Sequence, residues 1–252
     1  MRLRILATLA VAGAITAAPA SAQNVQLELA LLVDVSGSVS AAEFDLQRQG
    51  YVNAFNDPAI QASIASGNSL AATFIYWSAG NQQQVAVPWT LINSAASASS
   101  FAAAVLAAAR PFSGNTGPGS AINFAIPLFG SNSFTSARQV IDVSGDGAQN
   151  SGADTSDARD AALAAGIDQI NGLPILGEGG LLAFYQNNIQ GGVGSFTTPA
   201  DNFEDFDAAV RSKIGREIVT TIPEPETYAL MLAGLGAVGW AARRRKARAA
   251  TA

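Results

Sequence analysis

The sequence contains neither cysteine nor histidine among its 252 residues. Without cysteine there is no disulfide and no thiolate nucleophile, and without histidine there is no Ser-His-Asp triad and no histidine-bound zinc. These two absences exclude several catalytic and metal-binding chemistries. The lack of cysteine does not exclude export, because a chain of this length can bury a stable core without disulfides.

Basic residues are scarce in the central part of the chain. Residues 23–222 contain seven Lys and Arg against 17 Asp and Glu, which gives this region a net charge near −10, whereas the whole chain stands at −5. The other basic residues gather at the two ends. An acidic central region without a basic patch argues against nucleic acid as a partner.

The N-terminus has the composition of a secretory signal peptide. Two arginines precede an apolar run over residues 5–18, and small residues follow it. A buried N-terminal helix is the alternative, but the charge, the length and the cleavage pattern together favour a signal peptide. We therefore expect residues 1–22 to be removed by cleavage between Ala22 and Gln23.

The C-terminal region, residues 223–252, combines three features in a fixed order. Pro223-Glu224-Pro225 comes first, an apolar run over residues 228–242 follows, and a cluster of Arg and Lys comes last. As a helix the apolar run would span about 22 Å, which is less than the ~30 Å hydrocarbon core of a bilayer. The basic cluster is expected to stay on the cytoplasmic side. This order resembles the PEP-CTERM sorting signal of Gram-negative bacteria.

That resemblance implies a route for the protein. It implies recognition by an exosortase-type membrane protease, removal of the tail, and export through an inner-membrane intermediate to the cell surface or beyond. Contact with the membrane is then expected only transiently, through the short C-terminal transmembrane segment.

Strands alternate with helices between the two ends, which predicts a mostly parallel sheet covered on both sides. The expected fold of residues 23–222 is a three-layer α/β domain with one antiparallel edge hairpin. A capping box at Ser40 and Glu43 marks the start of the first helix. We expect strands at 26–33, 70–77, 83–89 and 140–144, with a weak strand over 167–176 that Asn171-Gly172 interrupts. The expected helices are those beginning at Ser40 and those at 101–109, 120–128, 155–165, 181–189 and 202–215.

Oxygen-bearing side chains follow two of these strands, at the sheet edge where open α/β folds bind ligands. Asp34, Ser36 and Ser38 come after the first strand. Asp146 follows the strand over 140–144, and Thr116 lies in the Gly-rich loop between them. Each piece alone is typical of a turn or a helix cap. Together they supply the carboxylate and hydroxyl oxygens that a hard cation prefers, so we expect a Mg²⁺ site, with Mn²⁺ or Ca²⁺ as alternatives.

The same five residues resemble the metal-ion-dependent adhesion site of von Willebrand factor A (VWA) domains. That family's pattern is Asp-x-Ser-x-Ser, then a Thr in a Gly-containing loop, then Asp-Gly after the central strand. The resemblance implies that all five side chains bind the metal, directly or through water. It also implies that an acidic group of a partner protein or polysaccharide completes the coordination.

Asp142 departs from the VWA pattern, in which apolar residues precede the Asp-Gly. A carboxylate in the middle of a strand must be hydrogen-bonded or neutralised. It is either a structural acid or a side chain that supports the metal loops from behind. Residues 142–150, with 171–175, resemble a bacterial VWA-like subfamily of unknown function.

The expected function is therefore an exported, non-enzymatic binding module. One alternative is a structural envelope protein that uses the metal only for its own stability. A second alternative is a carboxylate-based hydrolase in which Asp34 and Asp146 act as the two acids.

Overall fold

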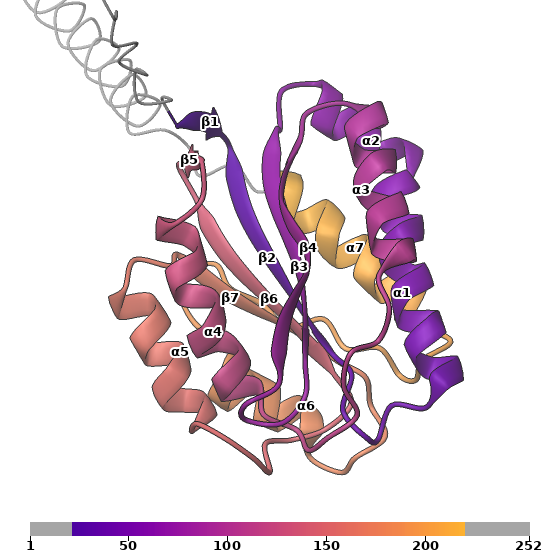
Figure 1. Cartoon of the computed structure of the whole chain (residues 1–252), viewed down its shortest axis with the longest axis vertical. Helices are drawn as coiled ribbons and strands as arrows, with labels where there is room; N and C mark the ends of the chain where they lie inside the picture. The colour runs from indigo at the N-terminus through magenta and orange to yellow at the C-terminus, as the bar shows by residue number, and fades with distance from the viewer. Residues whose placement is uncertain (1–21, 220–252) are drawn as a thin grey trace, which may run out of the picture.

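The computed structural model describes residues 22–219 (Figure 1). The predicted signal peptide up to residue 21 lies outside the described residues. So do the sorting motif Pro223-Glu224-Pro225 and the predicted membrane segment over residues 228–242. Among residues 22–219, no helix is both long enough and apolar enough to cross a bilayer.

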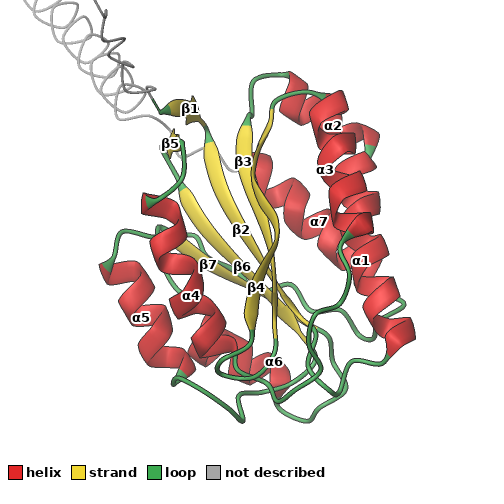
Figure 2. Ribbon diagram, in the orientation of Figure 1, coloured by secondary structure: helices red, strands yellow, loops and turns green. Residues whose placement is uncertain are grey.

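The centre of the molecule is a five-stranded sheet with helices on both faces, as Figure 2 shows. Neighbouring strands run parallel except at one edge, where β4 pairs antiparallel with β3. This confirms the predicted three-layer α/β fold with an edge hairpin. In spatial order the strands are β4 (Gln83–Ile92), β3 (Leu70–Trp77), β2 (Leu27–Asp34), β6 (Gln139–Gly145) and β7 (Gln169–Pro174).

The central strands are continuous apolar runs because both faces of the sheet are covered. Every residue of β2 and of β3 is buried. One face of the sheet packs against four helices: α1 (Ala41–Asn56), α2 (Pro58–Ala65), α3 (Ala95–Ala107) and α7 (Phe206–Val219). The other face packs against α4 (Pro118–Gly130), α5 (Thr155–Ala164), α6 (Leu181–Phe184) and the short π-helix η1 (Tyr185–Ile189).

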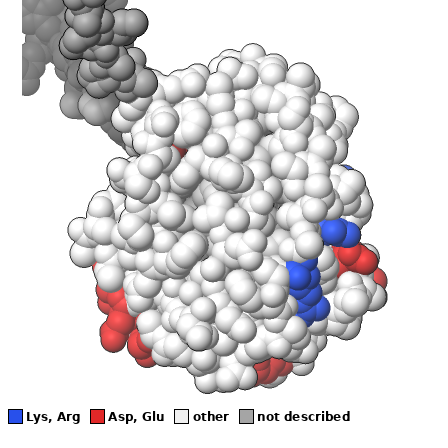
Figure 3. Space-filling model, in the orientation of Figure 1, with Lys and Arg blue, Asp and Glu red and all other residues white. Residues whose placement is uncertain are grey.

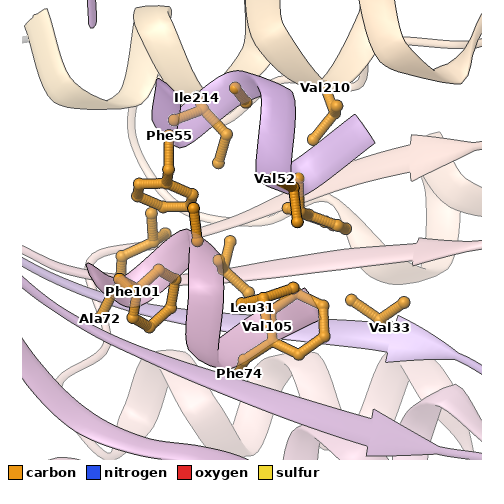
Figure 4. Packing of buried hydrophobic residues seen from close by; sticks show 14 of the residues in the cluster. Leu31, Val33, Val52, Phe55, Ala72, Phe74, Phe101, Val105, Val210 and Ile214 are labelled. Carbon is orange, nitrogen blue, oxygen red and sulfur yellow. The ribbon is translucent and has the colours of Figure 1, made fainter. Parts of the chain in front are cut away.

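The larger core lies between the sheet and α1, α3 and α7. Figure 4 shows Leu31 and Phe74 of the sheet facing Phe55, Phe101 and Ile214 of the helices. The rings of Phe55 and Phe101 meet edge to face at 4.8 Å between centroids. Such aromatic pairs add packing energy beyond the area that they bury.

The predicted capping box at the start of α1 is present. Ser40 Oγ accepts the Glu43 N–H at 3.3 Å, and Glu43 Oε2 accepts the Ser40 N–H at 2.8 Å. This cap fixes where α1 begins, directly after the loop that carries Ser36 and Ser38. Pro58 follows the end of α1 and opens α2, because proline fits the first turn of a helix.

One sequence-based expectation about strands was wrong. The predicted interruption at Asn171-Gly172 is absent, and β7 runs through both residues in a fully buried strand. The side chain of Asn171 is hydrogen-bonded inside the core, and Gly172 leaves the room that Tyr185 occupies. A short parallel pair, β1 (Gln23–Val25) with β5 (Phe134–Ser136), was not predicted.

Candidate metal centre

The loops after β2 and β6 meet at the carboxyl edge of the sheet, the lower edge in Figure 2. Asp34 is the last residue of β2, and Asp146 comes directly after β6. The two strands are hydrogen-bonded neighbours, with Val33 opposite Ser144. The two predicted acidic ligands therefore emerge side by side, because parallel neighbours end at the same edge.

Asp34 lies at the bottom of the site and is fully buried. Its Oδ1 accepts the backbone N–H of Ser36 at 2.7 Å, whereas its Oδ2 has no hydrogen-bond partner among the described residues. The pKa of Asp34 is raised to about 7, because the raising effects of burial and of the neighbouring Asp146 carboxylate outweigh the lowering effect of the Ser36 N–H. A buried carboxylate oxygen without a partner is unfavourable, and a cation would satisfy it.

Two serine hydroxyls connect this region to Asp146. Ser36 Oγ lies 3.0 Å from Ser38 Oγ, and the Ser38 hydroxyl donates to Asp146 Oδ1 at 2.8 Å. Ser36 is buried while Ser38 is exposed, so the oxygens run from the interior to the surface. Burial raises the pKa of Asp146 from its ordinary value, although the Ser38 hydroxyl lowers it.

Thr116 is brought to the same place by a loop that Asn150 holds. The Thr116 N–H donates to Asn150 Oδ1 at 2.8 Å, and the Thr116 carbonyl accepts the Asn150 N–H at 3.0 Å. A Cβ placed on Gly147 would lie 3.4 Å from Thr116 Oγ1. The threonine hydroxyl thus lies against the backbone that follows Asp146, and all five predicted residues belong to one cluster.

Close packing below the cluster explains why Gly145 precedes Asp146. A Cβ on Gly145 would come 2.7 Å from Asp34 Oδ2 and 2.9 Å from the hydroxyl of Tyr185. The Tyr185 hydroxyl is buried and has no hydrogen-bond partner within residues 22–219. Burial, followed by the charge of Asp34, holds the pKa of Tyr185 well above its usual range.

Several residues that position these loops were not predicted from the sequence. The guanidinium of Arg110 donates to the carbonyls of Val35 and Ser36 at 3.0 and 2.7 Å, which fixes the first loop. Gln47 reaches the carbonyl of Asp34 from α1 at 3.3 Å. No local pattern marks Arg110 or Gln47, since each acts on a loop from a distant segment. Asn150, in contrast, follows Asp146-Gly147 closely in the sequence, and this proximity is a signal that could have identified it as a residue of the site.

Asp142 lies away from these loops. It is fully buried, and its Oδ2 is 2.6 Å from the Nζ of Lys213 on α7. No hydrogen bond joins it to a metal-loop side chain in the described part of the chain. Asp142 thus forms an ion pair between the sheet and α7.

The donor set is two carboxylates and three hydroxyls, all of them hard oxygen ligands of the kind that Mg²⁺ and Ca²⁺ prefer. Over residues 22–219 no group of three or more Asp, Glu, His or Cys residues is arranged to hold a metal ion. The five-residue set nevertheless fits one cation, because Asp34 Oδ2 is buried without a partner and the Ser36 and Ser38 hydroxyls connect the Asp34 loop to Asp146.

The surroundings of the cluster are acidic. A cleft of about 290 Å³ opens beside Asp146, and Glu43, Glu178 and Glu204 line it. Glu178 Oε2 also accepts the N–H of Ala148 at 3.0 Å. On the face drawn in Figure 3, acidic side chains lie at the lower left and the bottom, while most of that face is uncharged.

Solved structures place this fold among VWA domains. Proximal thread matrix protein 1 of the mussel byssus aligns with a TM-score of 0.59 at 13% identity, over 78% of this chain and 49% of that chain. The pilus adhesin SpaC of Lactobacillus rhamnosus GG aligns with a TM-score of 0.59 at 14% identity, over 80% of this chain and 32% of that chain. A von Willebrand factor type A protein of Catenulispora acidiphila aligns with a TM-score of 0.52 at 13% identity, over 77% of this chain and 43% of that chain. The chain spans about half or less of each of these structures.

The chain therefore has a VWA-like fold. It belongs to the family described as "Protein of unknown function (DUF1194)", whose pattern matches residues 24–222. Residues 221–246 match the PEP-CTERM protein-sorting motif, which indicates export to the cell surface by way of the membrane. No curated protein matches the sequence.

Proposed function

We propose that this protein is an exported binding module of the cell surface or extracellular matrix. Its metal-ion-dependent adhesion site would bind an acidic group of a protein or polysaccharide, without chemical turnover of that partner. The observation that carries the proposal is the buried Asp34, whose Oδ2 has no hydrogen-bond partner among the described residues, next to a loop whose Ser36 and Ser38 hydroxyls lead to Asp146.

Asp34, Ser36, Ser38, Thr116 and Asp146 would hold one divalent cation, and Mg²⁺ suits this oxygen set best, with Mn²⁺ and Ca²⁺ as alternatives. The bound ion would supply a positive charge at the protein surface. Other residues of the chain would position these ligands. Arg110 and Asn150 hold the two flanking loops in place, and Gly145 lets β6 approach Asp34.

The negative charge of the domain explains why an acidic partner would need the metal. Residues 23–222 stand near −10, and the cleft beside Asp146 is lined by glutamates. An acidic partner therefore meets repulsion at the metal-free site, and a divalent cation reverses the local sign. Metal dependence and a preference for acidic groups are two consequences of the same charge distribution.

The similar structures and the sorting motif support this setting. One neighbour is named as a byssus matrix protein and another as a pilus adhesin, and a further structure of the byssus protein is described with a zinc-occupied metal-ion-dependent adhesion site. The sorting motif supports processing by an exosortase-type protease in a Gram-negative envelope. Surface display would place the site where acidic polysaccharides and proteins are accessible.

The proposal can be tested by surface binding to an immobilised polyuronate and to polyglutamate, with dextran as the neutral control. Binding is measured at fixed ionic strength in Mg²⁺ and in EDTA. We expect Mg²⁺-dependent binding to the acidic polymers alone. Thr116→Ala removes one oxygen donor and should lower affinity by about 1–3 kcal/mol, or ~5- to 150-fold.

Thr135→Ala is the matched control, because Thr135 is exposed on β5, away from the loops that carry the site. This variant should bind as wild type does. Equal binding in Mg²⁺ and EDTA would contradict the adhesion mechanism and favour the structural envelope protein. Release of cleaved polymer would instead favour a hydrolase.

A further inference from the structure

A second cluster of ionisable groups lies inside the core, between the sheet and α7. Lys213 is fully buried, and its Nζ lies 2.6 Å from Asp142 Oδ2 and 2.6 Å from Glu217 Oε1. The amide of Asn171 donates to the same Glu217 oxygen at 2.8 Å. The lysine amine is therefore held between two carboxyl groups, one on a central strand and one on its own helix.

The contact between Lys213 and Asp142 is close. Nζ lies 2.6 Å from Asp142 Oδ2, and the side chains of Lys213 and Glu217 both interact with the Asp142 carboxyl group. Because the carboxyl carbon is bonded to the contacted oxygen, at about 1.2 Å, Nζ lies at most about 3.8 Å from the carbon that it could attack.

The three groups are removed from water. Asp142, Lys213 and Glu217 have at most 1% of their surface exposed, and the ring of Phe196 lies 5.6 Å from the lysine Nζ. Removal from water disfavours the ionised form of a carboxyl group. Burial is the main cause that raises the pKa of Asp142, with Glu217 adding to it and Lys213 opposing it.

From this geometry we propose that Lys213 and Asp142 condense into an intramolecular isopeptide bond, with Glu217 as the proton carrier. This inference is independent of the proposed metal site. It would give a chain without cysteine a covalent link between the interior strand β6 and α7, the last element of the described domain.

The reaction balances without an oxidant or a co-reactant. A proton passes from the Lys213 ammonium to the Asp142 carboxylate, which leaves a free amine beside a carboxylic acid. The Nζ–Cγ bond forms, the bond from Cγ to one carboxyl oxygen breaks, and that oxygen departs as water. Glu217 accepts a proton from Nζ and returns it to the departing oxygen, so it ends unchanged.

The charges that remain are also balanced. Before the reaction the cluster holds Lys213 and Arg138 against Asp142 and Glu217, since the Arg138 guanidinium donates to the backbone carbonyl of Glu217. The bond eliminates one buried ion pair and leaves Arg138 facing Glu217. Buried ion pairs carry a desolvation cost, which gives the condensation a driving force.

Intact mass spectrometry of the purified full chain under denaturing conditions tests the proposal. We expect a mass lower than that of the sequence by one water. Because cyclisation of an N-terminal glutamine loses ammonia, the link must also be located by trypsin digestion. The expected product is residues 139–159 joined to residues 212–216, with Lys213 uncleaved.

Three variants make the test specific. Lys213→Arg and Glu217→Gln should each restore the mass calculated from the sequence, whereas Asp45→Asn, at an exposed acid of α1, should keep the loss. If the core variants fail to fold, the mass and the tryptic peptides of the wild-type chain are enough to test the proposal. A folded wild-type chain with its full calculated mass and free peptides 139–159 and 212–213 would overturn the proposal, and metal binding would be unaffected by that outcome.

Discussion

At the residue scale, Asp34 shows how a binding site departs from the rules of a stable core. Most buried polar atoms in proteins have hydrogen-bond partners, and Oδ2 of this fully buried carboxylate has none in the described structure. Its burial disfavours ionisation, as the raised pKa shows. The arrangement is understandable if the carboxylate is kept for a cation rather than for the fold.

We therefore expect Asp34→Ala to abolish Mg²⁺ binding while the fold survives. The variant loses the hydrogen bond from the Ser36 N–H, but it also relieves a buried, unpartnered charge, so the two effects oppose each other. The unfolding free energy in EDTA should stay within about 2 kcal/mol of wild type. Isothermal calorimetry checks the binding, and urea denaturation checks the stability.

Asp45→Ala is the control for charge, since Asp45 is exposed and pairs only with Arg48 in the described salt bridges. Its Mg²⁺ heat should match that of wild type. A normal binding heat in Asp34→Ala would place the metal elsewhere in the molecule.

At the scale of elements, the site depends on how closely β6 passes β2 and η1. Gly145 is the last residue of β6, and the space where its Cβ would lie is taken by Asp34 and by Tyr185 of η1. Strand, loop and helix therefore meet at a point where only glycine fits. The position of the Asp34 carboxylate depends on this contact, although Gly145 supplies no ligand.

Gly145→Ala should consequently damage both stability and binding. The added methyl group must displace Asp34 or Tyr185, and overpacking of this kind costs about 1–3 kcal/mol. Mg²⁺ affinity should fall as well, since Asp34 is one of the two groups displaced. Thermal unfolding in EDTA and calorimetric titration with Mg²⁺ measure the two effects separately.

Gly130→Ala is a suitable comparison, because a Cβ at this helical position meets nothing within 4 Å. Alanine is the better helix former by about 1 kcal/mol, so this variant should be equally or more stable. If Gly145→Ala behaved in the same way, the close contact at Asp34 would have no energetic importance.

At the scale of the whole molecule, an acidic domain stands between a predicted N-terminal export signal and a C-terminal sorting motif. The family pattern covers residues 24–222 and the sorting motif covers residues 221–246, so the two matches meet just after α7 ends. An acidic surface would repel acidic partners until a cation binds. Export is therefore compatible with the metal-dependent recognition that we propose.

Processing at both ends follows from this organisation. We expect the exported protein to begin at Gln23 and to lack residues 228–252, because both signals are removed during export and sorting. Intact mass spectrometry of protein recovered outside the cell measures this directly. An exported form that still carries the basic cluster at residues 243–246 would contradict removal of the tail.

The sequence by itself determined the order of elements and the five candidate ligands. Apolar runs such as Leu70–Trp77 identify buried strands, and the Ser40–Glu43 pattern identifies the start of α1, because both depend on local chemistry. Asp34 and Asp146 could be predicted together since residues after parallel neighbours meet at one edge. The metal and the partner stay predictions.

Only the tertiary structure decided the long-range contacts. It brought Arg110 to the loop after β2, paired Asp142 with Lys213, and let β7 continue through Asn171 by supplying hydrogen bonds to Glu217 and Phe196. The stability of a buried polar group depends on partners from distant segments, which no local pattern records. For that reason the sequence could mark Asp142 as a departure from the VWA pattern but could not pair it with Lys213.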